Sequence, residues 1–197
     1  MNIEARLVGE TAALSLAGVR KQFGTSTALD GVDLAVSPGE VFALLGPNGA
    51  GKTPTIKLIL AFLRADAGTV SGAGIDAGAD PIGARRHIAY IPEQVALYPG
   101  MTGIENLRYF TTLAGLSLDD ARCRVLLEEA GLPAEALPRK AGSYSKGMRQ
   151  KVGIAIAIAR SAQLLLLDEP TSGLDPAASA EFSRTLRDGK SLFRPSD

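Results

Sequence analysis

The stretch that decides the fold is LLGPNGAGKTPTIKLIL, residues 44–60, whose Gly46, Gly51, Lys52 and Thr53 fill the pattern G-x-x-x-x-G-K-[ST]. A continuous apolar run precedes this stretch, and apolar residues at helical spacing follow it. Phosphate-binding loops occur between a strand and a helix, because glycines let backbone N–H groups approach phosphate oxygens at a helix N-terminus. The stretch therefore predicts a nucleotide site of the P-loop type.

The residue types of this loop predict their own roles. Lys52 is expected to reach the β and γ phosphates, and the Thr53 hydroxyl to ligate Mg²⁺. Pro54 lacks an N–H, but a proline is tolerated in the first helical turn, where that N–H has no intrahelical partner. We expect the fold to survive and phosphate affinity to fall about tenfold to a hundredfold. The predicted nucleotide contacts are Gly46, Pro47, Asn48, Gly49, Ala50, Gly51, Lys52, Thr53 and Pro54.

Composition narrows the class of protein. The chain has 197 residues, 46% of them hydrophobic, and equal numbers of basic and acidic residues at 21 each. No global charge favours nucleic acid or an anionic membrane surface. The single cysteine, Cys123, allows no internal disulfide and fits a reducing cytoplasm. The most apolar region, Val152–Leu167, is too short and polar to span a membrane. If the function involves a membrane, another subunit must cross it.

Hydrophobic periodicity predicts an α/β fold. Short β-rich runs, broken by glycine turns, lead to a strand at Val41–Leu45. A helix is expected after the loop, with Ile56, Ile59, Leu60 and Leu63 on one face. Residues 66–90 return to β character. We expect a P-loop NTPase core with a mostly parallel sheet, an antiparallel β subdomain at the N-terminus and a helical insertion.

The second half of the chain is expected to be helical with one strand. Residues 103–137 carry a helical stripe of Leu126, Leu127 and Ala130, and a further helix is predicted at 146–160. The expected single domain covers residues 1–197. Its β-rich part is about 1–90, its helical insertion about 95–160, and its catalytic core strands lie in about 41–64 and 164–175.

The sequence LLLLDEP, residues 164–170, predicts a buried strand that ends in Asp168 and Glu169. Ligands of open α/β sheets bind at the carboxyl ends of strands. Asp168 is expected to hold Mg²⁺ through water, and Glu169 to orient or deprotonate the attacking water.

Further motifs make the resemblance specific. SYSKGMRQKVGIAIAIAR, residues 143–160, lies before these acids, and TSGLDP, residues 171–176, lies after them. This order resembles the ATP-binding subunit of ABC transporters over almost the whole chain. Ser145 to Gln150 resembles the family signature LSGGQ, with Tyr144 and Lys146 as departures. The resemblance implies that Ser145 and Gly147 bind the γ-phosphate of ATP held by a second subunit, and Ser145 is a plausible helix N-cap.

The resemblance implies roles for other residues. Gln94 matches the Q-loop glutamine that touches Mg²⁺ and links the nucleotide to the membrane subunit. Phe23 matches the aromatic residue that stacks on adenine, although a core phenylalanine is an equal alternative. Ser172 to Asp175 resembles the D-loop, which contacts the other subunit of a homo- or heterodimer. The implied cofactors are ATP and Mg²⁺, and the implied catalytic residues are Glu169, Gln94 and Lys52.

One departure concerns the end of the chain. Family members carry a switch histidine on a strand beyond the D-loop, whereas the single histidine, His87, precedes Gln94 and is expected at the surface. The absent strand would lie between the strands leading to the P-loop and to Asp168. We therefore expect a shortened chain whose sheet exposes apolar faces and unpaired backbone groups.

The leading hypothesis is an ATPase that powers transport by a partner permease and lies at the inner face of the plasma membrane. The alternative is a nonhydrolysing nucleotide-binding or regulatory fragment, suggested by Pro54 and the absent histidine. A GTPase is disfavoured because no N-K-x-D motif occurs. ALYPGMTGIENLRYF, residues 96–110, looks most like subunits of export-type systems.

Overall fold

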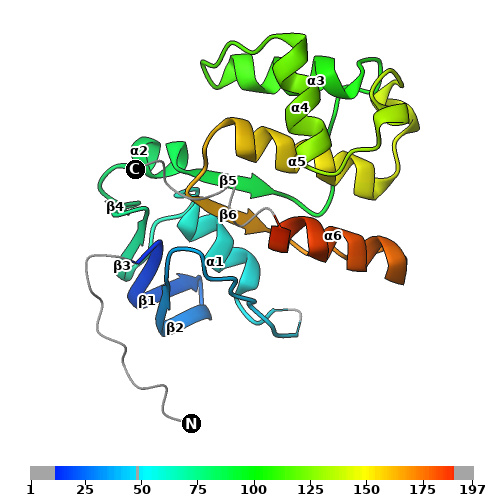
Figure 1. The fold of residues 1–197 in the computed structure, drawn as a ribbon. Helices are drawn as coiled ribbons and strands as arrows, with labels where there is room; N and C mark the ends of the chain where they lie inside the picture. Colours follow the sequence, from blue (N-terminus) through cyan, green and yellow to red (C-terminus); the bar gives the residue numbers. More distant parts are fainter. Residues whose placement is uncertain (1–11, 48, 189–197) are drawn as a thin grey trace. The chain divides into compact units, whose positions relative to one another are not determined.

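The computed structural model describes residues 12–47 and 49–188, so the predicted contact Asn48 lies outside the described residues (Figure 1). The chain divides into two compact units, Met1–Ile88 and Ala89–Asp197. Each unit has its own secondary structure and is described by itself.

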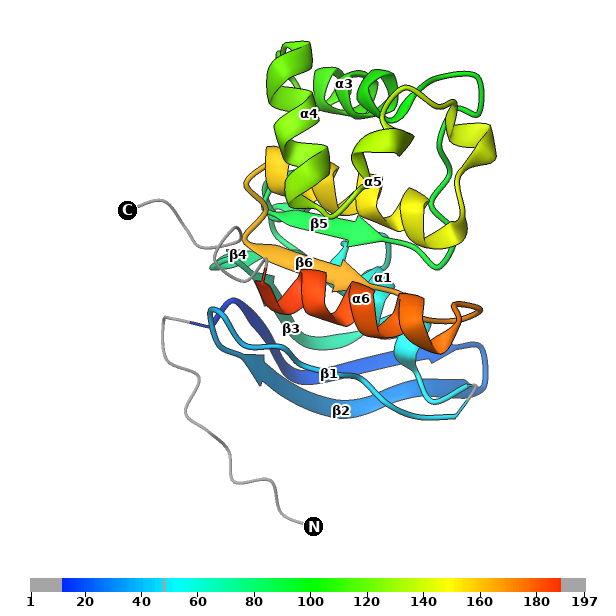
Figure 2. The same ribbon diagram turned by 45° about the vertical axis from the view of Figure 1, so that its right-hand side comes forward.

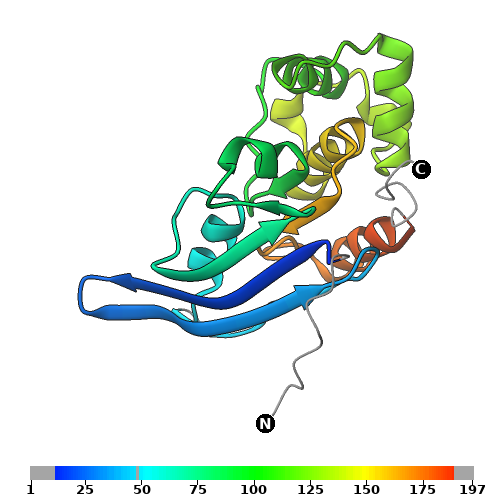
Figure 3. The same cartoon turned by 90° about the vertical axis from the view of Figure 1, so that its left-hand side faces the viewer.

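The first unit is built on a four-stranded antiparallel sheet in the order β2-β1-β3-β4. A long hairpin joins its first two strands (Figure 3). The buried side chains include Leu16, Val19 and Val70, exposed by 1%, 0% and 6%. The predicted antiparallel β subdomain is therefore confirmed. The strands are β1 Leu14–Phe23, β2 Ser26–Val36, β3 Ala67–Gly72 and β4 Ile75–Asp76.

The prediction of a strand at Val41–Leu45 is wrong, because this segment belongs to no strand of the structure. Its apolar side chains are exposed, Val41 by 69% and Leu45 by 88%. A β-strand exists only where a neighbouring strand satisfies its backbone hydrogen bonds. No described residue provides such a ladder for this segment. The apolar side chains of this segment are thus exposed because it joins no sheet, whereas the sequence predicted a sheet that is present and exposes its apolar faces.

Two helices belong to the first unit, α1 Lys52–Ile59 and α2 Pro81–Arg86. Helix α1 is shorter than the apolar spacing predicts, since its C-cap is Leu60 and Ala61 follows with φ 53°. Leu63 therefore lies beyond the helix and off the expected stripe. Helix α2 was not predicted from the sequence. It begins at a proline after Asp80, whose side chain accepts a hydrogen bond from the Gly83 N–H at 2.8 Å.

The second unit holds the two-stranded β5–β6 sheet, in which the strands run parallel (Figure 2). The chain passes from β5 to β6 through a helical region that contains α3, α4 and α5. This connection confirms the predicted helical insertion, and β6 coincides with the predicted strand. The elements are β5 Ile88–Ile91, α3 Gly103–Leu113, α4 Asp120–Glu129, η1 Ala134–Ala136, η2 Ala141–Ser143, α5 Lys146–Ala159, β6 Leu164–Leu167 and α6 Pro176–Asp188.

The core of the second unit joins its helices. Leu126, Leu127 and Ala130 of the predicted stripe are exposed by 1% or less, and they pack in one cluster with Leu107. Phe182 of α6, exposed by 2%, belongs to the same cluster. Among residues 12–47 and 49–188, no helix is long and apolar enough to cross a membrane.

Candidate functional site: a P-loop and two ordered turns

The P-loop of the first unit curls into the N-terminus of α1. Gly51 is the N-cap residue and has φ 83°, a conformation that favours glycine. The first helical bond runs from the Thr55 N–H to the Gly51 carbonyl at 2.9 Å. The N–H groups of Lys52 and Thr53 precede this bond, so they need no carbonyl of the helix and are suited to bind an anion.

Two glycines of the pattern are required by close packing. A Cβ on Gly51 would lie 2.7 Å from the Ala28 carbonyl oxygen and from Leu29 Cδ2 of strand β2. A Cβ on Gly46 would lie 2.9 Å from the Ala50 Cβ. Larger residues at either position would displace the backbone, so the glycines set the curvature of the loop.

Lys52 folds back over this loop. Its Nζ donates to the carbonyl oxygens of Gly46 at 2.5 Å and Pro47 at 3.3 Å. An ammonium group held above a curled loop beside helical N–H groups is a donor set that fits a polyphosphate. The geometry of the described part of the loop thus agrees with the role predicted for Lys52.

Pro54 lies inside α1 without breaking it. Helix α1 runs from Lys52 to Ile59, and its first hydrogen bond is donated by the residue after the proline. The prediction that the fold tolerates Pro54 is confirmed. The third residue of the helix has no N–H, so the N-terminus offers one donor fewer to a phosphate.

Phe23 stands at the end of β1, at the tip of the β1–β2 hairpin. Phe23 is 48% exposed, and Lys21 Nζ lies 5.6 Å from the centroid of its ring. The alternative of a core phenylalanine is therefore wrong. An exposed ring beside a cation can stack on a base.

Asp168 in the second unit is held by the neighbouring strand β5 through its backbone and its side chain. The Asp168 backbone N–H donates to the Ile91 carbonyl at 3.0 Å, and the carboxylate Oδ2 accepts from the Tyr90 hydroxyl at 3.0 Å. Burial, with a smaller contribution from this hydrogen bond, raises the pKa of Tyr90 to about 12. The hydroxyl consequently keeps its proton near neutral pH and donates to Asp168.

Glu169 follows β6 in a left-handed backbone conformation, with φ 44°. A non-glycine residue is uncommon in this region, and such strain clusters at functional sites. The Glu169 carbonyl accepts from the Ser172 N–H at 3.0 Å, which closes a turn directly after the strand. The side chain is exposed at the end of that strand, where a water-activating carboxylate is expected.

Ser145 caps α5 as the sequence predicts. Its Oγ accepts from the Met148 N–H at 3.2 Å. The first helical bond of α5 runs from the Arg149 N–H to the Ser145 carbonyl at 3.1 Å, which leaves the N–H groups of Lys146 and Gly147 ahead of it. This helix start can present donors to an anion.

Tyr144 anchors the turn before α5. Its buried hydroxyl donates to the Ala136 carbonyl at 2.9 Å and accepts from the Gly103 N–H at 3.1 Å. This departure from the family signature is therefore a structural residue that ties the helix start to α3.

The sequence did not reveal three residues that hold Asp168 and the turn after β6 in place. Tyr90 orients Asp168, Lys146 bonds to the turn after β6, and Gln150 Nε2 donates to the Pro170 carbonyl at 2.5 Å. The predicted residue Gln94 is exposed in the turn after β5. Periodicity could not reveal these partners, because each contact joins residues far apart in the sequence.

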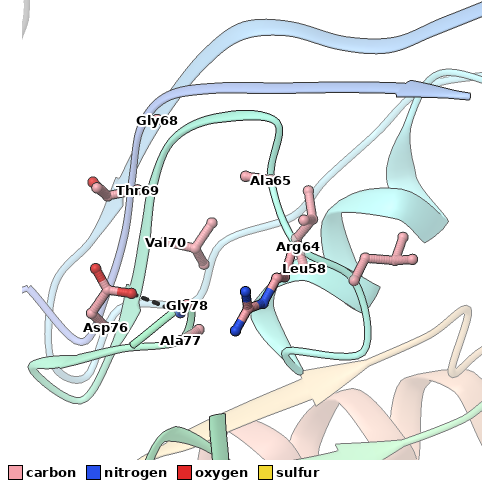
Figure 4. Close-up of a pocket in the computed structure, with 10 residues that line it drawn as sticks. Leu58, Arg64, Ala65, Gly68, Thr69, Val70, Asp76, Ala77 and Gly78 are labelled. Atoms are coloured by element: carbon pink, nitrogen blue, oxygen red, sulfur yellow. Dashed lines mark hydrogen bonds between the residues drawn. The ribbon is translucent and has the colours of Figure 1, made fainter. Parts of the chain in front are cut away.

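A hollow outside these motifs lies between α1 and the β3–β4 hairpin, where Arg64, Val70 and Asp76 contribute to its lining (Figure 4). The Asp76 carboxylate accepts from the Gly78 N–H at 2.6 Å. The lining includes none of the residues predicted to bind nucleotide. Among the described residues no cluster of three or more His, Cys, Asp or Glu could hold a metal ion.

Comparison with known protein families shows which family this chain belongs to. The family described as "ABC transporter" matches residues 29–172, which cover the P-loop, Gln94, the start of α5 and Asp168. The chain belongs to the ABC transporter family. This membership agrees with the resemblance predicted from its motifs.

Relatives of this ABC transporter chain include ATP-binding proteins of resistance and export systems. It is 44% identical over 168 residues to the doxorubicin resistance ATP-binding protein DrrA of Mycobacterium tuberculosis, covering 83% of this chain and 50% of that protein. It is 40% identical to the Nod factor export ATP-binding protein I of Burkholderia thailandensis, covering 86% and 56%. The chain thus spans about half the length of the curated relatives it matches.

Solved structures confirm the fold. An ATP-binding subunit of an ABC transporter is 35% identical, with a TM-score of 0.75 over 91% of this chain and 75% of that one. A dimeric ATP-binding cassette in a post-hydrolysis state bound to ADP and Pi is 26% identical, with a TM-score of 0.75 over 90% and 82%. The α/β P-loop NTPase fold predicted from the sequence is therefore confirmed.

Proposed function

We propose that this chain is the ATP-binding part of an ABC transporter, which binds Mg-ATP and hydrolyses it to power a partner membrane permease. The observation that carries the proposal is the P-loop. Lys52 Nζ lies over the Gly46 and Pro47 carbonyls at the N-terminus of α1, where a polyphosphate finds the donors it needs.

Each residue has a role that follows from its chemistry. The loop N–H groups and Lys52 bind and orient the phosphates, and Phe23 stacks on the base. Thr53, Gln94 and Asp168 supply the oxygen ligands that suit Mg²⁺, which neutralises charge on the phosphates when it is bound. Glu169 accepts a proton from the attacking water.

Two chains are needed for complete sites in this proposal. The α5 N-terminus, with the Ser145 cap and Gly147, is assigned to the γ-phosphate of ATP on a second subunit. The relative of known structure that binds ADP and Pi is dimeric, which supports this assignment. The pairing of two such chains and their association with a permease would place the protein at the inner face of the membrane.

The proposal favours an export-type system. Relatives at 44% and 40% identity are named for doxorubicin resistance and Nod factor export. We assign recognition of the transported substrate to the permease, because none of the roles proposed for the ATP-binding residues involves that substrate.

A single-turnover assay tests the proposal. Phosphate release is measured at saturating Mg-ATP for the wild-type chain, Glu169→Gln and the surface control Glu135→Gln. We expect the Glu169 variant to bind ATP normally and to lose release by about 10²–10⁴-fold, as removal of a general base does. The control should match the wild type. Equal release from the Glu169 variant and the wild type contradicts the role of Glu169.

A nonhydrolysing nucleotide-binding or regulatory role is the second candidate, because Pro54 removes a donor from the phosphate site. The same assay separates the two functions. ATP binding without phosphate release in the wild-type chain would support the second candidate.

A further inference from the structure

Lys146 occupies the signature position where it departs from the family pattern, and its side chain is directed at two other segments of its own unit. Its Nζ donates to the Ser172 carbonyl at 2.5 Å, in the turn after β6. The same Nζ lies 3.4 Å from Glu93 Oε1, in the turn after β5. The ammonium group therefore joins the start of α5 to two turns that are 79 residues apart in sequence.

The turn after β6 is held against α5 at a second point. Gln150, one helical turn beyond Lys146, donates through Nε2 to the Pro170 carbonyl at 2.5 Å. A Cβ on Gly147 would lie 3.9 Å from Leu174 Cδ2, an ordinary packing distance. Side chains at i and i+4 lie on one helix face, so α5 presents two successive donors to this turn.

The turn after β5 is held to α5 by Lys146, whereas the turn after β6 also has the bond from Gln150. Glu93 is separated by one residue from the end of β5, and Gln94 follows it directly. The side chains of Lys146 and Glu93 are 27% and 45% exposed, so the pair is partly protected from solvent. A charge-assisted bond to a carbonyl and an ion pair on the same ammonium group hold both turns in one arrangement.

We propose that Lys146 is a positioning residue that couples the Glu93–Gln94 turn to the Ser172–Gly173 turn across the start of α5. This inference rests on the proposed function, in which Gln94 serves the chain's own nucleotide and the Ser172 turn faces the second subunit. A displacement of either turn is transmitted through the Lys146 ammonium group to the other. Coupling of this kind links the two nucleotide sites of a dimer without a contact between the Lys146 ammonium group and nucleotide.

Amide hydrogen exchange tests the coupling without requiring hydrolysis. Exchange is followed in peptides covering residues 93–98 and 171–174 of the full chain, which contain the hydrogen-bonded amides of Tyr98, Ser172 and Leu174. Lys146→Met should accelerate exchange in both segments by about threefold to tenfold, because both turns lose a charged partner. Glu93→Gln should accelerate it only in residues 93–98, since the bond to the Ser172 carbonyl remains. Lys146→Arg should restore protection at least in part.

Lys140→Met is the matched control, because Lys140 forms a comparable exposed ion pair with Glu105 at 3.5 Å. It should leave both segments unchanged. Unchanged exchange in both segments of Lys146→Met overturns the inference. Weaker ATP binding by that variant without a change in exchange also overturns it, since Lys146 would then act on nucleotide.

Steady-state kinetics give the functional readout. Lys146→Met should lower kcat by about threefold to tenfold and leave KM for ATP near its wild-type value, because the P-loop is not altered. If the wild-type chain hydrolyses no ATP, the proposed function fails, and the exchange data still decide the coupling.

Discussion

The Tyr90 hydroxyl donates to Asp168 Oδ2 at 3.0 Å and so joins β5 to the carboxylate that ends β6. This bond engages one carboxylate oxygen, and an ionised carboxylate has a second oxygen that can accept further bonds. The structure thereby explains how Asp168 can be oriented before any nucleotide binds.

Removal of this hydroxyl should disturb the metal dependence of hydrolysis. In Tyr90→Phe we expect about 1 kcal/mol less stability, the usual value of one hydrogen bond. The Mg²⁺ concentration for half-maximal phosphate release should rise a few-fold, because Asp168 loses its orienting partner. Tyr109→Phe, which alters an exposed tyrosine pair, is the control. An unchanged Mg²⁺ dependence in Tyr90→Phe would argue that the bond has no functional role.

Pro54 should make ATP binding weaker than it would be with a residue that has a backbone N–H at this position. Pro54→Ala restores a backbone N–H at the third residue of α1, and Pro54→Thr restores the N–H and a hydroxyl. We expect the threonine variant to bind Mg-ATP about tenfold to a hundredfold more tightly, with the alanine variant in between. Isothermal titration calorimetry measures the three dissociation constants. Equal constants would remove Pro54 from the account of affinity.

The exposed ring of Phe23 should contribute to affinity and little to folding. Phe23→Ala is expected to raise the dissociation constant for ATP about threefold to tenfold, the range given by loss of one aromatic stacking contact. Phe23→Tyr should bind like the wild type. Phe62→Ala serves as a matched control, since Phe62 is 64% exposed in the same unit. The idea fails if both alanine variants bind ATP equally well.

Tyr144 should stabilise the second unit through its buried hydroxyl. Tyr144→Phe leaves the Gly103 N–H and the Ala136 carbonyl without their partner, which should cost about 1–3 kcal/mol in urea unfolding. Tyr98→Phe, at a tyrosine that is 45% exposed, should cost much less. Similar losses in the two variants would contradict the assignment.

The same residue predicts a dependence on alkaline pH. Burial raises the pKa of Tyr144 above its ordinary value of 10.0, and the Gly103 N–H opposes the shift in part. The contribution of Tyr144 to the free energy of unfolding is complete at pH values below 10.0, the ordinary pKa of tyrosine. It is lost as the pH rises through the folded-state pKa, because the unfolded chain ionises first. Denaturant midpoints measured from pH 9 upward should therefore fall less steeply with pH for Tyr144→Phe.

Local sequence determined much of this protein. The glycine pattern around Lys52 predicts the turn into α1, because Gly51 has φ 83° and a Cβ there would lie only 2.7 Å from atoms of β2. The four leucines before Asp168 predict β6, and Ser145 predicts the start of α5. Each of these features depends on conformational preferences and caps that act within a few residues.

Tertiary structure decided the rest. Val41–Leu45 has the composition of a buried strand, but it forms none in this structure, because a strand needs a partner that local sequence does not supply. The hydrogen bond from Tyr90 to Asp168 and the contacts of Lys146 join distant segments, so no spacing in the sequence encodes them. The motifs thus fix which residues can bind a nucleotide, and the packing of α5 against the turn after β6 fixes how some of them are held.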